Sequence, residues 1–193
     1  MKSIIEEIVS VINDSIKSEL AAAKYSGKVF YGITERRQHK ETIAPCIVSQ
    51  DGRIEPIYLS NKVPVLFYHK INVTSFEYNI PQSFGKGMIT RTTHNMSLVA
   101  YCLKTKTGLN GFMLEQIIEK KMPSTWTADF KRKLALKSIN TKVQSCDHDA
   151  AAIYKRDWSG LKDPLIVPES SLIEVRYQIV RTYKGDCEVN CCN

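Results

Sequence analysis

The residues best suited to chemistry in this 193-residue chain are its cysteines and histidines. His148 stands between two aspartates, and a carboxylate beside an imidazole can orient a general base or a metal ligand. Cys146 lies two positions earlier, and further thiols gather near the C-terminus at Cys187, Cys191 and Cys192. Thiolate and imidazole are common zinc ligands, so the residue types alone would permit a zinc site or an enzyme here.

The spacing of these residues argues against that chemistry. The C-terminal thiols do not form a pair of CxxC motifs, and Asp147 and Asp149 fit a helix start, where Asp is favoured as a cap. The chain also has no serine in a nucleophile-elbow sequence and no cysteine with a catalytic signature. We therefore expect ordinary reduced thiols, and we assign no catalytic, cofactor-binding or metal-binding residue.

The strongest compositional signal is a basic middle segment. The net charge is +7, and residues 61–147 hold thirteen Lys or Arg against five Asp or Glu. Such an excess can face nucleic acid or an acidic protein, and it can equally form a solvated face. The partner-binding candidates come from a glycine-flanked loop and a basic run: Phe84, Lys86, Lys131, Arg132 and Lys133.

The chain begins with a predicted helix. Apolar residues recur at helical spacing from Ile4 to Leu20, which predicts an amphipathic helix of about six turns that closes near residues 24–27. A short predicted strand over Val29–Ile33 follows, and a polar stretch over residues 34–42 comes after it.

Extended structure is predicted for the next part. Asp51–Gly52 stands between two apolar runs, a pattern typical of a β-hairpin. Residues 63–80 form either one long bent strand or two strands joined near Asn72. Residues 81–87 then predict a flexible loop, because Gly85 and Gly87 flank a single lysine.

The second half alternates strands and helices. Asn95–Lys104 is apolar on both faces, which is typical of a central strand covered on two sides. Asn110 is a suitable N-cap for a helix over Gly111–Lys121. Alternation from Leu172 to Tyr183 predicts a final strand. The other expected elements are a turn or short helix at Trp126–Arg132, a strand at Leu134–Cys146 and a helix at Asp147–Trp158.

This order of elements predicts an α+β fold: a mixed, mainly antiparallel sheet flanked by helices, with an extended β arm or loop. We expect one domain over residues 1–193, from which residues 60–90 protrude. No apolar run approaches the length of a membrane span, so we expect no membrane partner.

The same order resembles that of the tail-terminator and neck (head–tail joining) proteins of tailed bacteriophages. The resemblance covers Arg91–Tyr183, and the N-terminal helix and Ala44–Val48 (APCIV) fit the usual opening of that family. Residues 50–90 are longer than a minimal member needs. The resemblance implies a non-enzymatic structural protein of the virion, present in the host cytoplasm during assembly. Such a protein forms a ring, usually a hexamer, that contacts portal, connector and tail proteins, with passing DNA as a further contact.

Two other classes of function stay open on the sequence alone. The basic middle segment would suit a nucleic-acid-binding module, whose affinity for DNA would fall with salt. An enzyme would have to use residues 146–149 together with the C-terminal thiols, and metal analysis would test that alternative.

Overall fold

The computed structural model describes residues 3–22, 28–39, 42–48, 53–59, 64–81, 88–123, 126–159 and 169–184. Its helices are α1 Ile4–Ala22, α2 Lys104–Thr107, α3 Gly111–Lys121, α4 Ala128–Lys133 and α5 Ala150–Asp157. A large sheet contains β1 Lys28–Ile33, β5 Val65–Pro81, β6 Met88–Leu103, β7 Ser138–Asp147 and β8 Ser170–Lys184. A small sheet contains β2 Glu35–His39, β3 Thr42–Val48 and β4 Ile54–Pro56.

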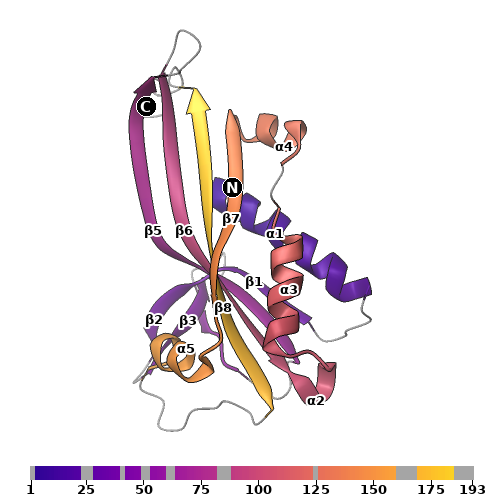
Figure 1. The fold of residues 1–193 in the computed structure, drawn as a ribbon. Helices are drawn as coiled ribbons and strands as arrows, with labels where there is room; N and C mark the ends of the chain where they lie inside the picture. Colours follow the sequence, from indigo (N-terminus) through magenta and orange to yellow (C-terminus); the bar gives the residue numbers. More distant parts are fainter. Residues whose placement is uncertain are drawn as a thin grey trace.

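The large sheet is ordered β1–β5–β6–β8–β7, and the small sheet is ordered β2–β3–β4. β1 runs parallel to β5, whereas β5, β6, β8 and β7 pair antiparallel in turn. Figure 1 shows the long strands running the length of the molecule, with α1 and α3 on one side and α5 beside the small sheet. The predicted α+β class, with a mixed and mainly antiparallel sheet, is confirmed.

The central strand, β6, is buried on both faces where it crosses the core. Met96, Leu98 and Ala100 lie in one apolar cluster together with side chains of α1 and α3. Val99 and Tyr101 lie in a second cluster, formed with residues of the small sheet and α5. The prediction of a central strand covered on two sides is therefore correct. The strand begins earlier than expected, because pairing with β5 and β8 continues beyond the core.

β5 is one continuous strand, which decides between the two alternatives for residues 63–80. Its pairing with β6 shifts register between Ile71 and Val73, a β-bulge that changes which side chains share a face. Before the bulge, Val65 and Phe67 are fully buried. The part of β5 that leaves the core therefore begins after residue 69, later than the expected start of the arm at residue 60.

The helix starts follow the predicted capping chemistry. The Asn110 side chain accepts a hydrogen bond from the Met113 amide at 3.0 Å, and α3 starts at the next residue. Asp149 accepts from the Ala152 amide at 3.0 Å in the same way and caps α5. α4 lies where a turn or short helix was expected, with Thr127 as its cap.

A further difference from the sequence-based expectation lies in the first half of the chain. The polar stretch over residues 34–42, for which no element was expected, contains β2, whose five residues pair with β3. The backbone ladder to β3 supplies hydrogen bonds that compensate for the weak strand propensity of its charged and polar side chains. α1 is described only as far as Ala22, and residues 23–27 lie outside the described part. Within that part, no helix is long and apolar enough to cross a membrane.

Candidate functional site

The outer half of the β5–β6 hairpin, residues 70–81 and 88–97, has one edge, on β5, that no strand of the described part of the chain covers. β1 pairs with β5 only from Val65 to His69. Beyond that point, β5 continues to Pro81 with β6 as its partner among the described strands. Figure 1 shows this half rising away from the small sheet and α5. Its backbone N–H and C=O groups on the far side from β6 are thus available to another strand.

Large apolar side chains are concentrated on this outer half. Ile71, Val73, Phe76 and Tyr78 are 40, 57, 54 and 61% exposed, and they are four of the eight exposed large apolar residues in the described part of the chain. The rings of Phe76 and Tyr78 stack with centroids 6.3 Å apart. Apolar side chains gathered at an open strand edge are typical of a surface that another protein covers.

β7 forms the opposite edge of the large sheet. Following the pairings straight across the sheet from the open edge of β5 leads to β7 at the same level along the strands. The pairings connect Ile71 of β5 to Met96, Met96 to Tyr177, and Tyr177 to Val143 of β7. Because each successive pair is antiparallel, β5 and β7 point in opposite directions. A β5 strand from a second copy in the same orientation would therefore lie antiparallel to β7.

A buried network of charges lies at the base of the projecting hairpin. The Lys70 ammonium contacts Asp157 at 2.7 Å and Glu174 at 3.0 Å, and these carboxylates are only 2 and 3% exposed. Arg156 contacts Glu174 at 2.7 Å. The Tyr68 hydroxyl donates a further hydrogen bond to Asp157 at 2.7 Å. The network joins β5, α5 and β8 where the sheet leaves the core.

The electrostatics of this network keep the Glu174 carboxylate charged. Burial by itself raises the pKa of Glu174, but Lys70, a hydrogen bond from Ser97, and Arg156 together hold that pKa below its usual value. Burial by itself lowers the pKa of Arg156, and Glu174 followed by Asp157 raise it above its usual value. Ionised carboxylates paired in this way do not act as proton donors near neutral pH.

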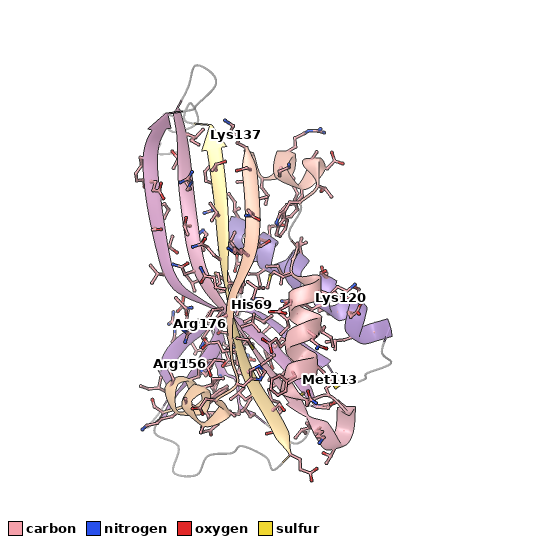
Figure 2. The ribbon with its side chains drawn as sticks, viewed as in Figure 1. His69, Met113, Lys120, Lys137, Arg156 and Arg176 are labelled. Atoms are coloured by element: carbon pink, nitrogen blue, oxygen red, sulfur yellow. The ribbon has the colours of Figure 1, made fainter. Side chains whose placement is uncertain are left out.

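A 730 Å³ pocket opens beside the network, and its lining includes Arg156 and Arg176, whose side chains are labelled in Figure 2. Its lining includes three cationic and three acidic side chains, so it does not favour a ligand of one charge. We therefore interpret the network as a structural connection between α5 and the sheet. The six charged side chains are Glu35, Lys70, Arg156, Asp157, Glu174 and Arg176.

The structure places three of the partner-binding candidates on α4. Arg132 pairs with Asp129 at 3.3 Å, and Lys133 pairs with Glu7 of α1 at 2.9 Å. Lys131 precedes them in α4 and is partly buried. Figure 1 shows α4 beside β7, at the same end of the sheet as the outer hairpin. The other two candidates, Phe84 and Lys86, lie outside the described residues.

The thiol and imidazole singled out in the sequence do meet in space, and they meet a third group. The Nε2 atom of His148 lies 2.8 Å from a carboxylate oxygen of Glu115 on α3, and Cys146 lies beside them. Glu115 was not among the residues singled out in the sequence, because it belongs to a different element, α3. Cys187 and its neighbours lie outside the described part of the chain.

Comparisons with known proteins gave no match to this chain, either against protein-family models or among curated proteins.

Proposed function

We propose that copies of this chain associate into a closed ring through the outer half of the β5–β6 hairpin. The observation that carries the proposal is the open edge of β5 from residue 70 to residue 81, together with its exposed apolar side chains. A neighbouring strand would complete the backbone hydrogen bonds of that edge and would cover the apolar surface.

The two free edges of the large sheet suggest how neighbours meet. β5 of one copy would pair antiparallel with β7 of the next, since the two edges lie at the same level and run in opposite directions. This contact uses a different surface on each partner, so it is head-to-tail. Such contacts close into a ring when the rotation between neighbours allows it.

We further propose that the ring is a structural component of the head–tail junction of a tailed bacteriophage, as a tail terminator or a neck protein. This placement rests on the order of elements, which resembles that family over Arg91–Tyr183. A hexamer is the subunit number that the resemblance implies. Portal, connector and tail proteins would be its partners, and α4 would present basic side chains to them or to passing DNA.

The test of ring formation is the mass of the purified full-length chain, measured by analytical ultracentrifugation. We expect one discrete oligomer, and we expect Val73→Lys to shift it to the monomer, because a lysine on the open edge opposes strand addition. Gln116→Lys adds the same charge to an exposed position of α3 and should keep the parent mass. A monomeric parent, or equal effects of the two variants, would contradict the proposal.

The test of the location is electron microscopy and mass spectrometry of particles from a host that expresses the chain. We expect a stoichiometric ring at the junction of head and tail. A protein absent from purified particles would contradict this part of the proposal. A salt-dependent gel shift of DNA by the isolated monomer would instead favour the alternative, a basic nucleic-acid-binding module.

A further inference from the structure

Three potential metal ligands converge at the contact between α3 and the end of β7. They are the carboxylate of Glu115, the thiol of Cys146 and the imidazole of His148, and one ligand atom of each lies within 4.8 Å of the others. The Nε2 atom of His148 is 2.8 Å from Glu115. The three residues come from α3, from β7 and from the turn before α5.

The imidazole of His148 is held in one orientation by its neighbours. The ring of Phe112 stacks on it with centroids 4.5 Å apart. On another side, a Cβ atom at Gly111 would stand 3.1 Å from Nδ1 of His148 and 3.0 Å from Ile173, so the helix backbone approaches the ring closely. These contacts hold the ring with its Nε2 atom directed at Glu115. Such prior orientation of a histidine ligand strengthens metal binding.

The surroundings of the thiol are negatively charged. The carboxylates of Glu115, Glu119 and Asp147 all act electrostatically on the Cys146 thiol. They would attract a divalent cation, and the cation would stabilise the thiolate as a ligand. The site therefore combines three donor atoms with a field that favours a cation.

We propose that Glu115, Cys146 and His148 bind one divalent metal ion of the zinc class. One sulfur, one nitrogen and one oxygen donor suit zinc better than magnesium or calcium, which prefer oxygen ligands alone. Ligand atoms around tetrahedral zinc stand roughly 3.3–3.5 Å apart. The Glu115 and His148 ligand atoms, now 2.8 Å apart, would therefore separate slightly, and the Cys146 thiol would move closer by about 1 Å.

The position of the site allows an ion to enter and leaves one coordination position for water. The side chains of His148 and Glu115 are 31 and 24% exposed. A 380 Å³ pocket with His148 in its wall opens beside the site, between residues 110–112 and 170–173. Three protein ligands with an open fourth position are the arrangement found in zinc sites that hold a water molecule.

The direct test is titration of the metal-free, reduced, full-length chain with zinc chloride, followed by calorimetry, and with cobalt chloride, followed by absorbance. The chain should carry Cys187→Ser, Cys191→Ser and Cys192→Ser, so that the C-terminal thiols cannot contribute. We expect one ion per chain, a thiolate-to-cobalt charge-transfer band, and a higher melting temperature with zinc.

Ligand variants and a matched control make the test specific. Cys146→Ser and His148→Gln should weaken zinc binding by at least about 100-fold, and the serine variant should abolish the cobalt band. Glu119→Gln removes a nearby carboxylate that is not a ligand, and it should change the affinity by only a few-fold. Glu115→Gln serves as a further ligand variant if either of the first two fails to fold.

Several results would overturn the metal site. They are the absence of stoichiometric binding, binding that survives Cys146→Ser and His148→Gln, and binding that is lost with the C-terminal cysteines alone. The outcome is separable from ring formation, because Cys146 lies at the level of His69, outside the part of β7 that would face the open edge of β5.

Discussion

At the scale of single residues, the most constrained side chain is His69, which is fully buried in β5. Its Nε2 atom lies 2.9 Å from Oδ1 of Asn13, and its Nδ1 atom lies 2.7 Å from the hydroxyl of Tyr177. The Asn13 amide donates to the carbonyl of Tyr31, which turns its oxygen towards the ring. Nε2 therefore carries the proton, and Nδ1 accepts from Tyr177. The neutral ring thus connects α1 to β5 and β8.

This network makes the protein sensitive to acid. Burial lowers the pKa of His69 to about 3, whereas an unfolded histidine titrates near 6.5. Neutral His69 therefore stabilises the fold fully above about pH 6.5, and that contribution is lost as the pH falls from about 6.5 towards 3. We expect the free energy of unfolding to fall by about 1.4 kcal/mol per pH unit from this residue. Urea denaturation at several pH values measures it.

Two variants separate the titration of His69 from the loss of its contacts. His69→Gln removes the group that binds the proton. The slope of the free energy of unfolding against pH should therefore decrease by the amount that corresponds to about one bound proton. Tyr177→Phe removes a hydrogen bond but keeps the imidazole, so it should lower stability at every pH and keep the slope. Burial, and secondly the charge of Arg181, also lower the pKa of His94 to about 4. His94 therefore adds to the loss of folding stability in acid. An unchanged slope in His69→Gln would contradict this account.

At the scale of elements, the charged network holds α5 and the base of the hairpin to the sheet. Lys70 and Arg156 each contact both buried carboxylates, Asp157 and Glu174. Removing one partner of a buried ion pair leaves uncompensated charge, which is more costly than the pair is stabilising. The network therefore sets the position from which the outer half of β5 projects.

We expect Lys70→Met to reduce the free energy of unfolding by about 3 kcal/mol, because each buried carboxylate loses one cation while Arg156 stays in contact with both. Lys155→Met is the matched control on the exposed face of α5, and it should change stability by no more than about 0.5 kcal/mol. Chemical denaturation at neutral pH gives both values. Equal stability of the two variants would mean that the network does not hold α5 in place.

At the scale of the whole molecule, the large sheet ends in two edges, on β5 and β7, that lack a further strand among the described residues, and the proposed ring would use both. The pairings place Ser75 at the level of Thr93, Val180 and then Asn140. Ser75 is exposed on one edge and Asn140 is exposed on the other. In the proposed ring, these two residues of neighbouring copies lie close together.

We expect a chain carrying both Ser75→Cys and Asn140→Cys to form a ladder of covalent oligomers on a non-reducing gel after mild oxidation. The highest band of the ladder counts the subunits of the ring. Each single substitution alone should give the pattern of the parent chain, which controls for the six native cysteines. Lys142→Cys combined with Ser75→Cys tests a register shifted by two residues. No ladder from either pair would exclude pairing of β5 with β7.

The sequence by itself determined the elements whose signals are local. Alternation over Leu172–Tyr183 predicted β8, and Asn110 predicted the start of α3, because side-chain periodicity and capping act within a few residues. Local signals of this kind along the chain were sufficient to predict the α+β class. β2 was missed, since its polar residues form a strand only through the ladder supplied by β3.

Only the tertiary structure decided which distant residues meet. Glu115 reaches His148 from another element, and Lys70 reaches Asp157 across 87 residues of chain. β5 is continuous because it pairs with β6 along its length. Its outer edge is open because β1 stops pairing at His69. Such contacts are set by strand order and packing, which no local pattern encodes. The candidate surfaces of this protein therefore became visible only when the sheet was assembled.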